Sequence, residues 1–255
     1  MKIAVLVKQV ADTAAKIELQ PDGSAVKLDD VQKVLNPYDE FAVEAAIQLK
    51  EKDGGEVTVV NVGPDSADEA VKTALAMGCD RAVVLRDGEA QGLDPAGTAA
   101  VLAAMLAREE FDLVLCGKQA VDDDAHLVGP AVAERLDLPV ATFATSLEVA
   151  DGKAVVGRDA DGIRETLAVP LPAVLTCQKG LNEPRYPSLP GIMQAARKPK
   201  DVVTLADLGM NPEPRVARQG MTLPPPRAEG KVLSGEIPDQ VKELVQLLRN
   251  EARAV

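Results

Sequence analysis

The stretch LVLCGKQAVDDDAHLVGPAVAERL, residues 113–136, decides the fold class of this chain. Its apolar start ends at Gly117, a polar turn with three consecutive aspartates follows, and a helical pattern begins near Ala125. A buried strand that passes through a short glycine-containing turn into a helix is the repeating unit of parallel α/β sheets. We therefore expect the turn at the carboxyl end of a strand, which is where such sheets bind ligands.

The same alternation of apolar and helical segments runs through the first half of the chain. Apolar runs predict buried strands over residues 3–7, 57–62, 81–87 and 111–116. Amphipathic patterns predict helices over residues 36–52, 65–78, 95–109 and 125–136. Asn36 suits the cap of the first of these helices, with Pro37 and Asp39 in its first turn. This order predicts an α/β fold with a doubly wound, mostly parallel sheet.

Other segments depart from the alternation. A PDGS turn in residues 16–28 predicts a β-hairpin excursion, and the turns ADGK and DADG in residues 140–169 predict a second hairpin. The apolar residues 172–177 are expected to return to the sheet. Four prolines in residues 180–200 predict a stiff loop rather than a helix, and residues 201–237 are also loop-like.

The composition restricts the class of protein. With 255 residues, of which 46% are hydrophobic, the chain can form one large domain or one domain with appendages. Aromatic residues make up only 2% and tryptophan is absent, so few rings are free to stack on a base or a flavin. The net charge of -12 repels phosphate backbones, and we therefore expect no nucleic-acid partner.

The cysteines and the apolar runs indicate where the protein works. Cys79, Cys116 and Cys177 have neither the spacing of a zinc site nor the pattern of a disulfide framework, which favours a reducing, cytoplasmic compartment. No apolar run approaches the ~18 residues of a membrane span, so we expect no membrane insertion. The start MKIAVLVKQV predicts a first strand rather than a signal peptide, because Lys8 and Gln9 interrupt its apolar run.

A ligand site is expected where four segments meet beyond the carboxyl ends of the strands. These segments are residues 8–13, 36–39, 62–64 and 117–128. Gly117 allows an unusual backbone angle or a close ligand approach, and a helix starting near Ala125 offers free backbone N–H groups to a phosphate. One of the three aspartates can cap that helix, and another can accept hydrogen bonds from ribose hydroxyls. The site therefore suits a nucleotide that is bound with little base stacking.

Alternatives to a nucleotide remain open at this turn. Aspartate-rich turns often serve only as solvated caps, and three acids could bind magnesium, although such sites draw ligands from separated positions, so we expect no metal. Neither GxxxxGK[ST] nor GxGxxG occurs, which argues against a P-loop and a standard dinucleotide fingerprint. His126, the single histidine, has no nucleophile to pair with and is expected on the helix surface or at the site edge rather than as a catalytic base. Lys8 and Lys118 either meet phosphate or are solvated.

The segment QKGLNEPRYPSLPGIMQAARKPK, residues 178–200, is a second candidate site, which we call the docking loop. Apolar residues stand in its polar setting, namely Leu181, Tyr186, Leu189, Ile192 and Met193. They either form a surface that docks onto a partner or point inward and pack against the rest of the chain. Residues 1–200 are thus expected to form a nucleotide-binding α/β domain that includes this loop. Residues 201–255 are expected to form an extended C-terminal arm whose amphipathic end helix lies on a partner or packs back.

Five segments resemble the beta subunits of electron transfer flavoproteins. They are VLVKQVAD, NPYDEFAVEAAIQLKE, TALAMGCDRAVVL, LVLCGKQAVDDDAHLVGP and LNEPRYPSLPGIMQA, in this order across residues 1–200. The pair GKQAVDDD and LNEPRYPSLP is specific enough that chance does not account for both. The resemblance implies an adenine-nucleotide alpha-hydrolase-like fold and a heterodimer in which the alpha subunit makes most of the contacts to a redox-active FAD.

The resemblance also assigns roles to individual residues. By the family pattern, a structural AMP contacts Leu6, Asn36, Pro37, Tyr38, Asp39, Val59, Val62, Gly117, Lys118, Gln119, Ala120, Val121, Asp122, Asp123, Asp124, Ala125, His126, Leu127 and Val128. Thr13 and Tyr38 match positions that approach the FAD of the alpha subunit. Leu181 matches an anchor that inserts into a hydrophobic pocket of partner dehydrogenases, and the C-terminal arm would wrap the alpha subunit.

Three functions compete on this basis. The first is a carrier subunit, without catalytic residues of its own, that takes electrons from flavin dehydrogenases such as acyl-CoA dehydrogenases to a quinone reductase. The second is an electron-bifurcating subunit with NADH as donor and a second FAD in the AMP pocket. Gly129-Pro130 resembles that branch, whereas Asp123 favours AMP because the branch has glycine there. The third is a nucleotide-binding sensor without redox partners, which would not need the docking loop.

Overall fold

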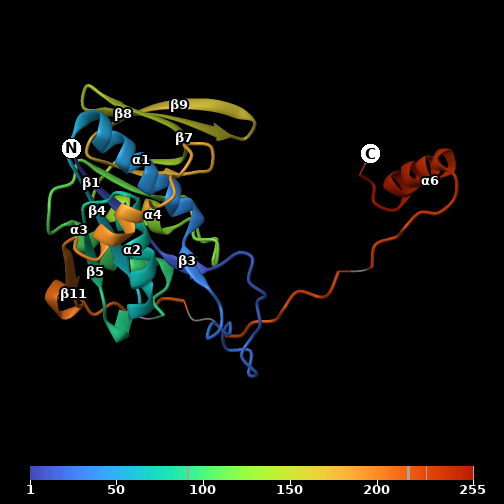
Figure 1. Ribbon diagram of the computed structural model, residues 1–255, viewed down its shortest axis with the longest axis horizontal. Coiled ribbons are helices and arrows are strands. Elements are labelled where there is room, and N and C mark those ends of the chain that lie inside the picture. The colour runs from blue at the N-terminus through green and yellow to red at the C-terminus, as the bar shows by residue number, and fades with distance from the viewer. Residues whose placement is uncertain (91, 217–218, 228, 255) are drawn as a thin grey trace. The chain divides into compact units, whose positions relative to one another are not determined.

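The computed structural model describes residues 1–90, 92–216, 219–227 and 229–254. It divides into two compact units, Met1–Gly220 and Met221–Val255. Residues 217, 218, 228 and 255 of the predicted C-terminal arm lie outside the described part. Figure 1 shows the strands and helices of the first unit, which has the predicted α/β architecture.

A nine-stranded sheet forms the centre of the first unit, in the order β11-β5-β4-β1-β6-β10-β7-β8-β9. The strands that pair in parallel are β1 (Lys2–Leu6), β4 (Glu56–Val62), β5 (Arg81–Leu85), β6 (Leu113–Gly117), β7 (Val140–Ala150), β10 (Ala173–Cys177) and β11 (Lys200–Val203). The antiparallel additions are β8 (Lys153–Ala160) and β9 (Ile163–Pro170). The sheet grows outward from β1 in both directions, so the strand order reverses between β1 and β6.

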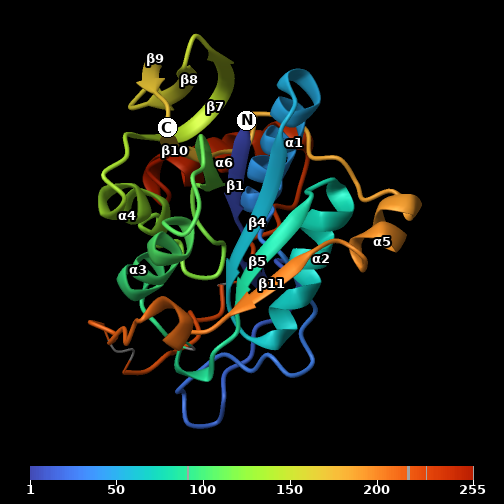
Figure 2. The same ribbon diagram turned by 90° about the vertical axis from the view of Figure 1, so that its left-hand side faces the viewer.

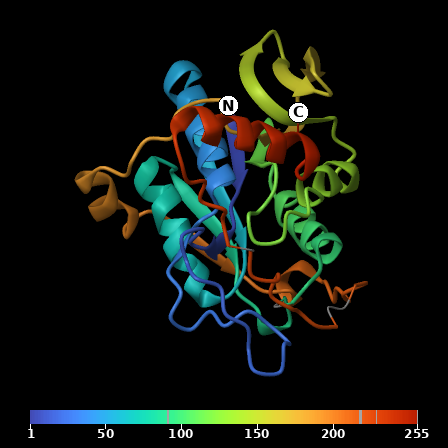
Figure 3. The same cartoon turned by 90° about the vertical axis from the view of Figure 1, so that its right-hand side faces the viewer.

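Helices cover both faces of this sheet, which confirms the doubly wound prediction. They are α1 (Pro37–Asp53), α2 (Asp68–Met77), α3 (Pro95–Leu106) and α4 (Val128–Arg135). Figures 2 and 3 show, from opposite sides, α1 and α2 on one face and α3 and α4 on the other. The apolar runs predicted as strands are buried on both faces because each face has its own hydrophobic cluster, one with α1 and α2 and one with α3 and α4.

The start of α4 differs from the prediction. The helix begins at Val128 rather than near Ala125, and its cap position, Leu127, makes no side-chain hydrogen bond to the helix. Asp124 and His126 have backbone φ angles of 47° and 53°, in the left-handed region that a right-handed helix cannot contain. The prediction that an aspartate caps this helix is therefore wrong, because the three aspartates belong to a separate turn.

The hairpins are more extensive than expected. The excursion at residues 16–28 holds an antiparallel bridge between Leu19 and Val26, and it projects from a two-stranded sheet of β2 (Gln9–Ala11) and β3 (Lys33–Leu35). Residues 140–169 form three strands, not one hairpin. The first half of β7 runs parallel to β10 within the main sheet. After a register shift near Ala144, its second half pairs with β8, and β8 and β9 form an antiparallel hairpin.

Two short elements occur where loops were predicted. Helix α5 (Leu189–Ala195) lies inside the docking loop, where Ser188 caps it by accepting a hydrogen bond from the Gly191 N–H (3.1 Å). Pro190 is compatible with this helix because proline is tolerated in a first turn. Strand β11 and the short 3-10 helix η3 (Ala206–Leu208) occupy part of the segment 201–237 that was expected to be loop-like.

The remaining elements complete the description. Two further 3-10 helices, η1 (Asp65–Ala67) and η2 (Gly88–Ala90), precede α2 and α3. The second unit contains α6 (Ile237–Asn250), which matches the predicted amphipathic helix, and within that unit Lys231 pairs with Glu243 at 2.8 Å. The three cysteines are buried and free. Among the described residues, no helix is long and apolar enough to cross a lipid bilayer.

Candidate functional site

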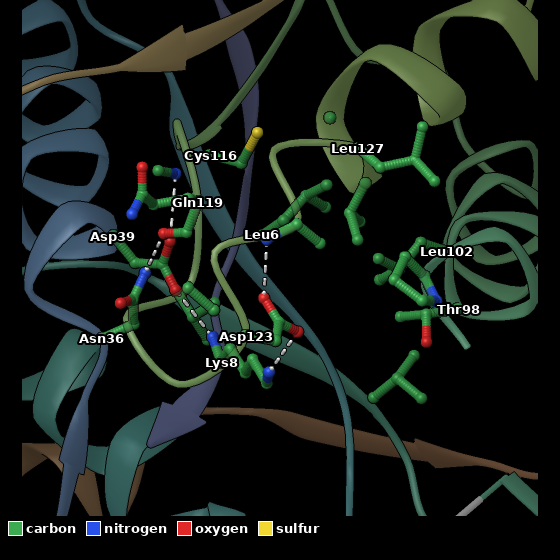
Figure 4. Close-up of a pocket in the computed structure, with 18 of the residues that line it drawn as sticks. Leu6, Lys8, Asn36, Asp39, Thr98, Leu102, Cys116, Gln119, Asp123 and Leu127 are labelled. Atoms are coloured by element: carbon green, nitrogen blue, oxygen red, sulfur yellow. Dashed lines mark hydrogen bonds and ion pairs between the residues drawn. The ribbon is translucent and has the colours of Figure 1, made fainter. Parts of the chain in front are cut away.

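A pocket opens beyond the carboxyl ends of β1 and β6, at the point where the strand order reverses (Figure 4). Its volume of about 400 Å³ lies within the ~300–1,000 Å³ that small-molecule sites commonly have. Thirteen of the predicted contact residues line it, namely Leu6, Asn36, Asp39, Val62, Gly117, Lys118, Gln119, Ala120, Asp123, Ala125, His126, Leu127 and Val128. The other six predicted contact residues are not among the described residues that line the pocket, namely Pro37, Tyr38, Val59, Val121, Asp122 and Asp124.

Asp39 ties together the three elements that form the floor of the pocket. Its carboxylate accepts hydrogen bonds from the backbone N–H of Lys8, at the end of β1, at 2.8 Å, and from that of Gly117, at the end of β6, at 3.0 Å. Only 5% of Asp39 is exposed, and this burial raises the pKa of its carboxyl to about 7 although both N–H groups lower it. The first turn of α1 is thereby fixed to the edge of the sheet.

Asn36 holds the turn that follows β6. Its side-chain amide donates to the Gln119 carbonyl at 2.8 Å and accepts from the Val121 N–H at 3.2 Å. The side chain is 1% exposed and both ends of its amide are used in this way. Asn36 occupies the N-cap position of α1 as predicted, but its side chain makes no capping hydrogen bond to the backbone of that helix.

Gly117 is required by the protein and not only by a ligand. A Cβ at this position would lie 2.5 Å from a carboxylate oxygen of Asp39 and 2.7 Å from the Cβ of Tyr38, closer than any side chain allows. Gly129 is similarly constrained, because a Cβ there would lie 2.8 Å from the Cys116 Sγ and from the Thr176 Cγ2. These two glycines let α1 and α4 approach the sheet closely and so define the pocket walls.

All three aspartates of the opening stretch have partners. The Lys8 ammonium lies 2.7 Å from Asp122 and 3.0 Å from Asp123, and Figure 4 shows this lysine beside Asp123. Burial lowers the pKa of Lys8, but hydrogen bonds and charge attraction from both aspartates raise it overall. Asp124 accepts a hydrogen bond from the Gln119 side chain. The three acids therefore hold the turn together, and two of them neutralise the charge of Lys8. Of the two alternatives for Lys8, phosphate contact or solvation, neither describes this ion pair.

The start of α4 forms one corner of the pocket. Leu127, Val128 and Gly129 line the pocket at the point where the first backbone N–H groups of α4 have no partner within the helix. Such N–H groups and the helix dipole favour an anion such as a phosphate.

Sequence reasoning missed the wall that α3 contributes. This wall consists of Ala90, Gly92, Leu93, Pro95, Thr98 and Leu102. The signal was present, because Asp94-Pro95 follows β5 and Asp94 caps α3 by accepting from the Gly97 N–H at 2.7 Å. The turn after β5 therefore belongs to the same carboxyl edge as the other four segments. Leu6, Leu93, Leu102 and Leu127 are apolar residues of the pocket wall, and Figure 4 shows Leu102 and Leu127 on the same side of the pocket.

A cluster of one cation and three rings borders the pocket. The Lys118 ammonium lies 4.9 Å from the centre of the Tyr38 ring and 5.6 Å from that of Phe143, within the range of cation–π attraction. The His126 ring lies 5.6 Å from Phe143. Phe143 comes from β7, and sequence reasoning did not find it. Thr13 lies in an exposed turn and is not part of the described pocket wall.

The docking loop combines exposed and buried apolar residues. Tyr186, Leu189, Ile192 and Met193 are 95%, 72%, 54% and 69% exposed, in agreement with a docking surface. Leu181 is only partly exposed and packs against the hydrophobic cluster on the α1 side of the sheet. Of the two alternatives for this loop, outward-facing and tucked-in residues therefore both occur.

Comparison with known proteins identifies the family. Residues 25–208 match the electron transfer flavoprotein domain. The chain is 43% identical over the full length of both proteins to the electron transfer flavoprotein subunit beta of Bacillus subtilis. It is 42% identical to the human subunit beta, with 90% of this chain and 91% of that protein covered, and 42% identical over both full lengths to the mitochondrial subunit beta of Oryza sativa subsp. japonica. The chain therefore belongs to the electron transfer flavoprotein beta-subunit family.

Proposed function

We propose that this chain is the beta subunit of a heterodimeric electron transfer flavoprotein that carries electrons from flavin dehydrogenases to a quinone reductase. In this proposal the pocket at the end of β1 and β6 holds a structural AMP. The observation that carries the proposal is the joining of α1, β1 and β6 by Asp39 around a pocket that also presents the N-terminus of α4. Family membership supports the electron-transfer role itself.

The residues of the pocket fit a nucleoside monophosphate. The free N–H groups at the start of α4 suit one phosphate group. The apolar wall between Leu93 and Leu127 suits a flat base without aromatic stacking. Asp123 also lines the pocket, and its carboxylate can accept a hydrogen bond from a ribose hydroxyl. AMP carries these three parts and no redox group, so its role would be to stabilise the chain.

The flavin would be held mainly by the alpha subunit. FAD supplies the electron-accepting chemistry when bound, and we assign no catalytic residue to this chain. The residues that would border the flavin are Tyr38 and Thr13, with Lys118 held over the Tyr38 ring. A cation in that place would attract a negatively charged ring system, which is the contribution that this chain can make to flavin binding.

One sequence feature that favoured the bifurcating alternative, Gly129, has another explanation. Gly129 has a structural reason, the close packing of α4 on Cys116 and Thr176, that needs no second flavin. A sensor without partners is disfavoured because four apolar side chains of the docking loop are exposed. We therefore retain the carrier subunit as the function, with acyl-CoA dehydrogenases as the class of donor and the cytoplasm as the compartment.

The second unit is proposed to pack on the alpha subunit. Its helix α6 has an apolar face on which Val241, Leu244 and Val245 are 53%, 47% and 40% exposed. A lone helix with such a face is stable in water only when another surface covers it. Replacing Leu244 with Glu should therefore lower the yield of heterodimer on co-expression, and an unchanged yield would contradict this assignment.

The docking role is tested by reduction of the heterodimer by an acyl-CoA dehydrogenase and its substrate, followed through the flavin absorbance. Leu189→Ala should slow this reduction, because Leu189 is 72% exposed on α5, while the FAD content stays unchanged. Leu181→Ala tests the residue that the family pattern implies, and an effect on stability is expected first because Leu181 packs on the core. If Leu189→Ala does not slow the reduction, the docking role is wrong.

A further inference from the structure

The exposed helix of the docking loop cannot be stable on its own. Helix α5 has seven residues, and isolated helices shorter than about 12–15 residues are marginal in water. Its buried contribution is small, since only Ala195 of the helix is buried. Contacts outside the helix must therefore hold it in place.

The first such contact lies before α5. The Arg185 guanidinium is 2.8 Å from Glu44 and 2.6 Å from Glu51, and it makes two hydrogen bonds to each carboxylate. Both glutamates project from α1, on the face next to the docking loop. Glu44 is only 3% exposed, and the Arg185 backbone N–H also donates to it at 3.2 Å. The hydrogen bonds that Arg185 donates to Glu51 and Glu44 raise the pKa of its guanidinium, so Arg185 stays charged at every physiological pH.

A second contact is made by Asn182, three residues before Arg185. The Asn182 side-chain amide donates to the Phe41 carbonyl of α1 at 3.0 Å. Together with Arg185, it attaches the residues before α5 to two successive turns of α1. The N-terminal end of the docking loop is therefore fixed by directional bonds and not by apolar packing alone.

A third contact lies after α5. The Lys198 ammonium donates to the Leu75 carbonyl at 2.8 Å and to the Cys79 carbonyl at 2.6 Å, both at the C-terminal end of α2. A helix C-terminus carries partial negative charge, which favours a cation there. Gly191 brings α5 close to the same place, because a Cβ at this residue would lie 2.3 Å from the Ala76 carbonyl oxygen.

We propose that Arg185 and Lys198 are positioning residues that clamp α5 at both ends, so that its exposed apolar side chains meet a dehydrogenase in a fixed geometry. This inference rests on the proposed docking function. Ordering a flexible loop at an interface costs conformational entropy, and a loop that is ordered beforehand avoids that cost. The clamp therefore acts on affinity for the dehydrogenase and not on the transfer of electrons once the complex has formed.

The test uses the complete heterodimer as substrate of an acyl-CoA dehydrogenase. Arg185→Gln and Lys198→Met should each raise the KM for the flavoprotein by about 10-fold, with kcat unchanged. Arg185→Lys keeps the charge but cannot pair with both glutamates in the same fork geometry, so an intermediate increase of about 3-fold is expected. Glu51→Gln removes the charge of the exposed partner and should resemble Arg185→Lys.

The matched control is Lys72→Gln, on α2. It removes one positive charge from the helix that α5 packs against, and among the described residues Lys72 forms its ion pair with Glu69, at 2.8 Å, and none with the docking loop. Hydrogen exchange supplies an independent readout, because the amides of residues 186–197 should exchange faster in the clamp variants and not in the control. A purely structural role would lower overall stability without this split between KM and kcat.

The outcomes separate the clamp from docking itself. A raised KM in Leu189→Ala together with unchanged KM values in all the clamp variants would overturn the clamp and leave docking in place. An unchanged KM in Leu189→Ala would instead contradict the proposed docking function. If Arg185→Gln does not fold, Arg185→Lys and Glu51→Gln decide the question, since both retain bonds to the buried Glu44.

Discussion

The backbone N–H of Gly117 donates a 3.0 Å hydrogen bond to Asp39, and a Cβ at residue 117 would lie 2.5 Å from the same carboxylate oxygen. The end of β6 and the first turn of α1 therefore meet without room for a side chain. This contact places Asn36 over the turn that carries the aspartates, and that turn forms one wall of the pocket. The pocket thus depends on a bond between two residues that lie 78 positions apart.

Gly117→Ala should destabilise the chain, because the added methyl group forces α1 and β6 apart. Overpacking of this kind costs about 1–3 kcal/mol. Urea unfolding of the heterodimer measures the loss, and the nucleotide content should fall with it. Gly88→Ala is the matched control, since a Cβ at Gly88 meets no atom within 4 Å. Equal stability of the two variants would contradict the proposed constraint.

Asp39 should make stability depend on pH. Burial raises its pKa to about 7 in the folded chain, from 3.8 in an unperturbed carboxyl, so the folded state binds a proton more tightly than the unfolded state. Its contribution is therefore complete below pH 4 and is lost as the pH rises through 7, with an upper bound of about 4 kcal/mol. Asp39→Asn removes this dependence.

Denaturant unfolding at several values between pH 5 and pH 8 tests the Asp39 prediction. The stability of the unsubstituted protein relative to Asp39→Asn should fall with increasing pH over this range. A difference that stays constant would show that the carboxyl does not titrate there.

Lys8→Met should weaken nucleotide binding with little loss of stability. The Lys8 side chain is 42% exposed, and exposed ion pairs stabilise a fold by only about 0–1 kcal/mol. Its removal leaves the negative charges of Asp122 and Asp123 without a countercharge at the pocket, and these charges repel a phosphate. We expect the affinity for AMP to drop about 10-fold, which corresponds to ~1.4 kcal/mol. Calorimetric titration of the stripped heterodimer measures it, and Lys16→Met, which removes an exposed pair with Glu18, serves as control.

Removal of the bound nucleotide should lower the melting temperature of the heterodimer. A ligand that binds only the folded state stabilises it by about 2.7 kcal/mol at a concentration of 100 times Kd. AMP should therefore restore the melting temperature, and adenosine should restore less of it because it lacks the phosphate for the α4 corner. Equal effects of AMP and adenosine would show that this corner does not bind the phosphate.

Much of this fold can be predicted from the sequence because its signals are local. The buried strands β1 and β6 contain continuous apolar runs, β4 is mostly apolar, and α1 starts with a proline and acidic residues as expected. The start of α4 could not be read in this way, because Asp124 and His126 adopt left-handed backbone angles that only the surrounding turn imposes. Helix α5 was not predicted because its segment is rich in prolines, but the helix itself contains only Pro190, in its first turn.

The candidate site was predictable at the level of segments and not of contacts. The rule that ligands bind at the carboxyl edge located the turn after β6, and it would equally have located the turn before α3. The partners of Asp39 and Asn36 lie on distant segments, so no local pattern could show that these side chains hold the pocket together. Phe143 likewise reaches Lys118 from a strand far along the chain.

The most direct test of the central claim is the identity of the nucleotides in the native heterodimer. The chain is co-expressed with its alpha subunit, the purified complex is denatured, and the released nucleotides are separated and quantified by chromatography. The account predicts one FAD and one AMP for each heterodimer. Two FAD molecules and no AMP, or FAD alone, would contradict it.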